Sequence, residues 1–309
     1  MSTPPKQPQP TKDVSKCTKC GACDKVCPIF VETKLSQLSP KLFIQDLNDG
    51  KKVSVDFLRE CLTCGMCFLV CPVKIEFLEI IREHRNKINR DPFSIPHKGY
   101  FHFLEDMMAS EKIATNFKKW LPSGYQTVEK SEIGYFMGCL PYFDIYFQYL
   151  GFDGKKIVEG ALSIFNKLGI KPVILETKCC GHDAYWRGEL EIFKNLAKQN
   201  AEIIKKSGIK ILVATCAECC RTLKIDYKQF FDFDLEVLHF TEFLEKHLDK
   251  LNFKENNISV TYHDACRLGR YLGIYEPPRK IIQAIKNINL VEMQKRKKTS
   301  LCCGVSAWM

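Results

Sequence analysis

Hydrophobic positions follow two different spacings along the chain, and the spacing changes near residue 131. Before that point the apolar residues come in short groups of helical period, broken by proline and glycine. One such group has Ser39 as a cap, Pro40 in the first helical position and Gly50 as a stop. After residue 131, short apolar runs typical of strands alternate with longer segments of helical period. The pattern predicts a helical N-terminal part followed by an α/β part.

The predicted strands of the α/β part each end just before cysteines. Residues 133–137, 172–175 and 209–214 are the expected strands, with helical faces within 157–168 and 193–204 between them. The cysteines that follow are Cys139, then Cys179 and Cys180, then Cys216. Open α/β sheets place their functional sites at the carboxyl ends of the strands, so these thiols are expected to share one site.

The same order of features then begins again. A strand at 258–262 leads to Cys266, a helix follows Pro278, and Cys302-Cys303-Gly304 repeats Cys179-Cys180-Gly181. The lone cysteine and the cysteine pair are separated by 39 residues in the first copy and 35 in the second. The chain therefore contains a predicted internal duplication.

The predicted fold class combines α+β and α/β: an α-helical module followed by a duplicated α/β domain whose second half is incomplete. The expected division is a disordered proline-rich tail at 1–16, the helical module at 17–90, a helical connector at 91–131, the first repeat at 132–255 and the second at 256–309.

Composition narrows the class of protein. With 309 residues and 45% hydrophobic content, the chain can bury a large core, and it has neither a membrane-spanning apolar run nor a secretory leader. We therefore expect a cytoplasmic protein, with peripheral attachment to the inner face of the membrane as the alternative. The net charge of +10 suits acidic proteins, anionic lipid or nucleic acid and does not choose among them. The 17 cysteines are clustered rather than evenly spread, which favours metal ligation over disulfides.

Two four-cysteine runs in the helical module carry the most specific signal. Each matches the bacterial 4Fe-4S pattern, in which three closely spaced thiolates hold one cubane and the fourth, before proline, serves the other. One predicted cubane is held by Cys17, Cys20, Cys23 and Cys71, and the other by Cys61, Cys64, Cys67 and Cys27. A pair of four-thiolate zinc sites is the alternative, but such sites usually join two close pairs across a longer gap.

The later cysteines form a second predicted site. Five thiols meet at the predicted strand ends, one more than a cubane or a zinc ion needs: Cys139, Cys179, Cys180, Cys216 and Cys219. A larger cluster and a cubane with a spare thiol are both compatible with this set. Cys220 is a possible further ligand, although a buried inert thiol is the favoured interpretation.

The segment from Tyr262 to Tyr275, YHDACRLGRYLGIY, together with the two Cys-Cys-Gly motifs, resembles the family of heterodisulfide reductase catalytic subunits. Relatives in that family are the iron–sulfur subunits of anaerobic glycerol-3-phosphate dehydrogenase and of glycolate oxidase. The resemblance covers about residues 15 to 309 and implies a non-cubane 4Fe-4S cluster on the five cysteines of the first repeat, which would then be the catalytic residues. In heterodisulfide reductase two such clusters cleave a disulfide.

Two departures from the family pattern qualify this expectation. Ala265 replaces a common proline, which affects only a local turn. The second repeat offers only Cys266, Cys302 and Cys303 as cofactor ligands, because its closing cysteines would fall near position 342 and the sequence ends at Met309. A gene fragment, a premature stop and a subunit completed by a partner are the three explanations. The shortened repeat makes a second cluster doubtful and argues against disulfide cleavage at two clusters.

Several other residues have both a functional and a structural interpretation. His182, Asp183, His263 and Asp264 could donate to cluster sulfurs or to substrate, or serve as caps and core groups. Arg267 and Arg270 could offset cluster charge or bind a carboxylate, or simply be solvated at the surface. The basic run at 295–298 is expected to be a solvated loop, with docking to an acidic partner or to anionic lipid headgroups as the alternative. The aromatic band at 142–149 is expected to be core and cluster shielding.

The sequence thus predicts an oxidoreductase subunit that relays electrons through two cubanes to the Cys-Cys-Gly cluster. The alternative is the relay subunit of a flavin-dependent dehydrogenase of the glycerol-3-phosphate or glycolate type, passing electrons toward quinone. No phosphate-cradling glycine loop is present, so we expect a flavoprotein, haem or membrane subunit as partner, and a redox carrier or disulfide as substrate. A zinc-based nucleic-acid module is the least favoured hypothesis.

Overall fold

The computed structural model describes residues 9–88, 96–113 and 116–305. Its contacts divide the chain into two compact units, which are described separately. The ferredoxin unit comprises residues 1–101, 183–190 and 301–309, and the sheet unit comprises residues 102–182 and 191–300. Four segments lie outside the described residues: 1–8 of the expected tail, 89–95 at the boundary of the expected helical module and connector, 114–115 of the connector, and 306–309.

The ferredoxin unit is built from short helices, as predicted. In chain order they are η1 (Val14–Lys16), α1 (Ala22–Val26), α2 (Pro28–Thr33), η2 (Ser36–Leu38), α3 (Pro40–Asn48), α4 (Val55–Glu60), α5 (Met66–Val70) and α6 (Phe77–Lys87). The expected cap of α3 is confirmed, since the Ser39 hydroxyl accepts a hydrogen bond from the backbone N–H of Leu42. Gly50, just after this helix, has a positive φ of 66°.

The two cysteine runs have matching backbones. Gly21 caps α1 with φ 72° and Gly65 caps α5 with φ 82°, a left-handed conformation that favours glycine. Two positions earlier, Lys19 and Thr63 also have positive φ. Helices α1 and α5 pack against each other. The two runs are therefore structural equivalents that face one another.

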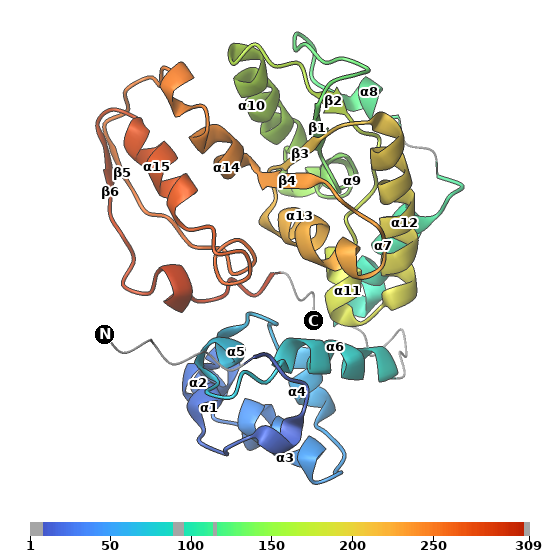
Figure 1. Ribbon diagram of the computed structural model, residues 1–309, viewed down its shortest axis with the longest axis vertical. Helices are drawn as coiled ribbons and strands as arrows, with labels where there is room; N and C mark the ends of the chain where they lie inside the picture. The colour runs from blue at the N-terminus through green and yellow to red at the C-terminus, as the bar shows by residue number, and fades with distance from the viewer. Residues whose placement is uncertain (1–8, 89–95, 114–115, 306–309) are drawn as a thin grey trace. The chain divides into compact units, whose positions relative to one another are not determined.

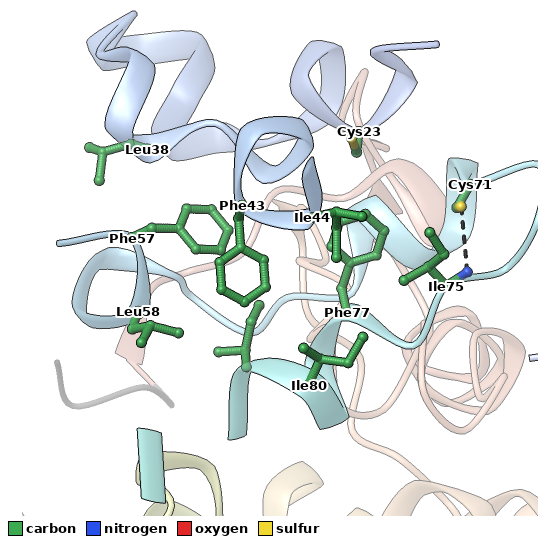
Figure 2. Packing of buried hydrophobic residues seen from close by; sticks show 11 residues of the cluster. Cys23, Leu38, Phe43, Ile44, Phe57, Leu58, Cys71, Ile75, Phe77 and Ile80 are labelled. Atoms are coloured by element: carbon green, nitrogen blue, oxygen red, sulfur yellow. Dashed lines mark hydrogen bonds between the residues drawn. The ribbon is translucent and has the colours of Figure 1, made fainter. Parts of the chain in front are cut away.

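Figure 2 shows the apolar core of the ferredoxin unit. Phe43 of α3 stacks on Phe57 of α4 with ring centroids 4.6 Å apart, and Ile44 is fully buried beside them. Cys23 and Cys71 border this core, and the Cys71 sulfur accepts a hydrogen bond from the backbone N–H of Ile75 at 3.5 Å. The core thus holds cysteines from both runs.

The chain before Cys17 is partly ordered. Thr11 pairs with the chain near Ile75 in a parallel bridge, and its carbonyl accepts a hydrogen bond from the N–H of Glu76 at 2.9 Å. Together with η1, this contact orders residues that were expected to form a disordered tail. The backbone pairing needs no apolar side chain, which is why the proline-rich composition does not reveal it.

Residues 183–190 pack against α6 inside the ferredoxin unit. The guanidinium of Arg82 lies 4.4 Å from the ring centre of Tyr185, and Gly188, with φ 82°, approaches the α6 backbone closely. Arg85 is buried and donates to the carbonyls of Leu58 (2.7 Å), Cys61 (2.6 Å) and Trp186 (2.8 Å). Its guanidinium therefore ties this segment to the loop that carries Cys61.

The sheet unit contains a four-stranded parallel sheet in the order β2-β1-β3-β4 (Figure 1). Its strands are β1 (Ile133–Phe136), β2 (Val173–Ile174), β3 (Ile211–Ala214) and β4 (Glu236–His239). The first three confirm the predicted strands. Strand β4 was not predicted, because its four residues run directly into a helix with no turn signal between them.

Helices cover both faces of this sheet (Figure 1). On one side, Phe165 of α10 (Gly154–Lys167) contacts Phe243 of α14 (Phe240–Glu245), with ring centroids 5.0 Å apart. On the other side, Phe193 of α12 (Leu190–Ser207) contacts Tyr227, which opens η6 (Tyr227–Gln229). The remaining elements between residues 96 and 250 are η3 (Pro96–Gly99), α7 (Tyr100–Ala109), α8 (Phe117–Trp120), α9 (Leu140–Tyr146), η4 (Gln148–Leu150), α11 (His182–Arg187), α13 (Ala217–Arg221), a π-helical turn η5 (Thr222–Asp226) and η7 (Leu248–Lys250).

A second, two-stranded parallel sheet follows, formed by β5 (Ile258–Val260) and β6 (Ile288–Leu290), with α15 (Glu276–Ala284) between them and η8 (Lys297–Thr299) after them. The predicted strand at 258–262 is confirmed over its first three residues. The helix begins at Glu276, two residues before Pro278, which suits proline in a first turn. Arg279 of α15 donates to both carboxylate oxygens of buried Asp264, at 2.7 and 2.8 Å.

Among the described residues, no helix has the length and apolar character needed to cross a membrane.

Candidate metal centres

The ferredoxin unit has two hollows, each lined by four cysteines. One is lined by Cys17, Cys20, Cys23 and Cys71 together with Pro72 and Ile75. The other is lined by Cys27, Cys61, Cys64 and Cys67 together with Pro28 and Met66. Each hollow receives three cysteines from one run and the fourth from the other. The structure thus groups these eight residues as the sequence predicts.

Burial makes several of these thiols hard to ionise in the absence of a cation. It raises the pKa of Cys23 and of Cys27 to about 12, and it raises the pKa of Cys67 well above the ordinary value. The backbone N–H of Ala22 instead lowers the pKa of exposed Cys20. A buried set of sulfur ligands favours a group that carries enough positive charge to displace the protons, as iron does.

The five cysteines of the predicted second site also meet, at the carboxyl edge of the four-stranded sheet. Their thiols form a connected series, in which Cys139 contacts Cys179, Cys179 contacts Cys180, Cys180 contacts Cys219, and Cys219 contacts Cys216. Cys139 follows β1 and Cys216 follows β3, the two central strands on either side of the point where the strand order reverses. The ligand-binding crevices of open α/β sheets form at such switch points.

Gly138 allows the chain before Cys139 to lie close to the Cys219 sulfur. It has φ 58°, and a Cβ atom there would lie 3.2 Å from the Cys219 sulfur and 3.1 Å from the Phe136 ring. Any larger residue would push against a candidate ligand. The glycine before Cys139 therefore makes room for the sulfur of the closing cysteine.

A buried amide on α12 holds the cysteine pair in place. The Asn200 side-chain oxygen accepts a hydrogen bond from the N–H of Lys178 at 2.7 Å, and its NH₂ group donates to the carbonyl of Cys179 at 2.8 Å and to the Tyr227 hydroxyl at 3.1 Å. Tyr227 in turn donates to the carbonyl of Cys180 at 3.2 Å. Both side chains are fully buried. Sequence reasoning missed these two residues, because their role depends on contacts with residues more than 20 positions away.

Two hydroxyl groups near the cysteines are buried without a hydrogen-bond partner among the described residues. They belong to Tyr142, in the first turn of α9, and to Thr177, two positions before Cys179. Buried hydroxyls are nearly always paired in folded proteins. Together with the five convergent thiols, these hydroxyls fit a site that holds a further sulfur-rich group.

His182 lies beside the cysteine pair but is held by neighbouring side chains. Its Nδ1 pairs with the Thr222 hydroxyl at 2.9 Å, and its Nε2 accepts a hydrogen bond from Arg267 Nε at 3.2 Å. Burial and the charges of Arg267 and Arg221 keep the pKa of His182 well below its usual value, so the ring is neutral. Arg267 is 1% exposed, which corrects its interpretation as a surface arginine: the turn after Cys266 folds inward toward His182.

Three other residues with both a functional and a structural interpretation, Asp264, His263 and Arg270, contact neighbouring protein groups. Asp264 accepts from Arg279 and from the backbone N–H of Lys297, and the Ser300 hydroxyl lies 3.5 Å from His263 Nε2. Arg270 donates to the backbone carbonyl of Ser300. These contacts favour the core interpretation for Asp264 and a loop-holding role for Arg270.

The predicted aromatic band is only partly buried. Tyr142 is buried, whereas Tyr149 is 80% exposed and therefore shields nothing. Cys220 is fully buried, and burial raises the pKa of its thiol to about 12.

The cysteines of the second repeat are divided between the units. Buried Cys266 belongs to the sheet unit, whereas Cys302 and exposed Cys303 belong to the ferredoxin unit. Their joint role as ligands stays a prediction.

The folds and cysteine sites define a class, the cysteine-rich iron–sulfur proteins, and comparisons with known proteins agree. The 4Fe-4S dicluster domain family matches residues 13–75, and the cysteine-rich domain family matches residues 133–224 and 260–308. No solved structure matches the chain.

Similar proteins identify the family. A dihydromethanophenazine:CoB--CoM heterodisulfide reductase subunit of Methanosarcina acetivorans is 30% identical, over 94% of this chain and 78% of its own length. An EtfAB:quinone oxidoreductase of Syntrophomonas wolfei is 26% identical over 93% of this chain and 35% of its own. A fumarate reductase (CoM/CoB) subunit of Methanothermobacter marburgensis is 32% identical over 56% of this chain and 33% of its own. The chain belongs to the family of this heterodisulfide reductase subunit, and it is an iron–sulfur oxidoreductase subunit.

Proposed function

We propose that this chain carries three iron–sulfur clusters and relays electrons between a partner subunit and an acceptor reduced at the edge of the four-stranded sheet. Two cubanes would be held by the crossed cysteine sets of the ferredoxin unit. A non-cubane 4Fe-4S cluster would be held by Cys139, Cys179, Cys180, Cys216 and Cys219. The single observation that carries the proposal is the connected series of these five thiols at the switch point of a parallel sheet.

Iron–sulfur clusters supply one-electron redox chemistry, and the protein residues bind, orient and enclose them. Asn200 and Tyr227 hold the backbone of the cysteine pair, so the thiols converge before the ligand arrives. Gly138 keeps space for Cys219. The acceptor is a disulfide in this proposal, since the chain is similar over most of its length to proteins named as heterodisulfide reductase subunits.

The second repeat supports a duplicated origin for the sheet unit. β5, α15 and β6 follow the same parallel strand–helix–strand order as β1, α10 and β2, and the cysteine-rich domain family matches both segments. We propose that Cys266, Cys302 and Cys303 are the cofactor ligands contributed by the second segment that matches the cysteine-rich domain family.

A second candidate function is electron relay from a flavoprotein to quinone. The similarity to an EtfAB:quinone oxidoreductase favours it. In that case the five-cysteine site passes electrons onward and cleaves no disulfide. Partner subunits and association with a membrane surface are part of both proposals.

Iron and sulfide counting on anaerobically purified protein tests the cluster assignment. We expect about twelve iron atoms per chain, whereas about eight would leave only the two cubanes and overturn the third cluster. Cys219→Ala is expected to lower the count from about twelve to about eight. Cys220→Ala, at the adjacent buried cysteine outside the thiol series, is the matched control and should leave it unchanged. Stoichiometric zinc without iron would overturn the whole proposal.

A further inference from the structure

Tyr142 is a buried group of the sheet unit whose hydroxyl has no role in the proposed function. It lies three residues after Cys139 in α9 and is 8% exposed, and its hydroxyl has no hydrogen-bond partner among the described residues. A buried hydroxyl left unpaired destabilises the fold, so such groups persist where a partner is supplied.

The ring of Tyr142 is held firmly. Phe117 packs edge-on against it, with ring centroids 5.7 Å apart and planes at 86°. Two residues along the same helix, Asp144 accepts hydrogen bonds from the N–H of Gly154 at 2.6 Å and from the Trp120 indole at 2.9 Å. These contacts fix how α9 is rotated and therefore where the Tyr142 hydroxyl lies.

Tyr142 lies in the first turn of α9, and the N-cap residue of this helix is Cys139 of the five-cysteine site. Burial, reinforced by Cys179, raises the pKa of Tyr142 to about 12. A phenol is a hydrogen-bond donor, and the sulfur atoms of the five-cysteine site are its candidate acceptors.

We infer that Tyr142 donates a hydrogen bond to a sulfur atom of the iron–sulfur group at the five-cysteine site and thereby sets its reduction potential. This inference rests on the proposed function. Reduction adds negative charge to the cluster and its sulfurs, and a donor aimed at them stabilises that charge. The Tyr142 hydroxyl therefore raises the potential, and removing it lowers the potential.

The test compares Tyr142→Phe with Tyr146→Phe. Both tyrosines lie on α9, but the Tyr146 hydroxyl already donates to the Met107 sulfur at 3.0 Å. Phenylalanine at position 142 keeps the contact with Phe117 and removes only the hydroxyl. Each protein is purified anaerobically, its iron and sulfide are counted, and the midpoint potential of the third cluster is measured by redox titration followed by electron paramagnetic resonance.

We expect Tyr142→Phe to keep its iron and to become about tenfold harder to reduce, which is about 59 mV for one electron. Tyr146→Phe should keep the wild-type potential. In the reduced wild-type protein, electron–nuclear double resonance in H₂O and D₂O should detect an exchangeable proton coupled to the cluster, and Tyr142→Phe should lack that coupling.

The outcomes separate this inference from the proposed function. A wild-type count of about eight iron atoms overturns both. A count of about twelve with the same potential in the two variants overturns the Tyr142 inference alone. Loss of iron from Tyr142→Phe also overturns it, because the hydroxyl would then serve assembly of the site.

Discussion

At the scale of single residues, the five-cysteine site depends on side chains that are not ligands. Asn200 is the clearest example, because one amide satisfies the backbone on both sides of Cys179 and also positions Tyr227. An amide can both accept from an N–H and donate to carbonyls, which neither a carboxylate nor an aliphatic side chain can do. The cysteine pair is therefore held by a residue that its own motif does not contain.

Asn200→Asp tests this role. The carboxylate keeps the shape of the side chain but cannot donate to the Cys179 carbonyl or to Tyr227, and it places a negative charge beside the thiolates. We expect loss of the third cluster, with the iron count falling from about twelve to about eight, and a loss of about 2 kcal/mol or more in the free energy of unfolding.

Asn195→Asp is the matched control for that measurement. Asn195 lies on the same helix, is exposed, and donates to the carbonyl of Ala109 at 3.2 Å. Its variant should keep all the iron and lose little stability in denaturant unfolding. Equal iron loss in both variants would show that the added negative charge on α12, and not the loss of the Asn200 hydrogen bonds, causes the iron loss.

At the scale of elements, backbone proximity decides how segments far apart in sequence pack. The segment after α11 lies on α6 because Gly188 has no side chain. A Cβ atom at this position would lie 2.5 Å from the backbone nitrogen of Asn86 and 2.9 Å from the Arg82 carbonyl oxygen, and φ is 82°. Neither the helix nor the loop can yield easily, since both contacts are with backbone atoms.

Gly188→Ala is expected to lower the free energy of unfolding by about 2–4 kcal/mol, through strain at positive φ and overpacking against α6. Gly160→Ala is the contrasting variant. Gly160 lies within α10 with nothing near its added methyl group, so alanine there should raise the free energy of unfolding by about 0.5–1 kcal/mol. Urea unfolding of the wild-type protein and the two variants measures both changes in the free energy of unfolding. A Gly160→Ala variant less stable than the wild type would contradict the argument.

At the scale of the whole molecule, each group of candidate ligands is drawn from segments far apart in the sequence. In the ferredoxin unit each hollow takes its fourth cysteine from the opposite run, which is possible because α1 and α5 pack against each other. The site of the sheet unit collects its candidate ligands from three strand ends spread from residue 139 to residue 219. A cluster held in this way would cross-link segments that lie far apart in the sequence.

Single serine substitutions test the crossed arrangement. Cys27→Ser should alter the same paramagnetic signal as Cys61→Ser, although Cys27 belongs to the first run in sequence. Cys71→Ser should likewise alter the signal that Cys17→Ser alters. Electron paramagnetic resonance of the four reduced variants distinguishes the two signals, and a Cys27→Ser spectrum that matches Cys17→Ser would contradict the crossing.

Local sequence was sufficient for the cysteine sets, the helical character of the ferredoxin unit and the first three strands of the sheet. Thiols at fixed short spacings and apolar residues at helical or strand period are short-range signals. They can be recognised in the sequence without knowing how distant segments pack. The α3 cap at Ser39 belongs to the same category, since it involves only residues three positions apart.

Tertiary structure alone decided the features that depend on distant neighbours. Strand β4, the pairing of Thr11 with the chain near Ile75, the burial of Arg267 against His182, and the amide of Asn200 on the cysteine pair each join residues 20 or more positions apart. Such contacts leave no periodic trace in the sequence, because hydrogen bonds and burial are set by what the folded chain places alongside a residue.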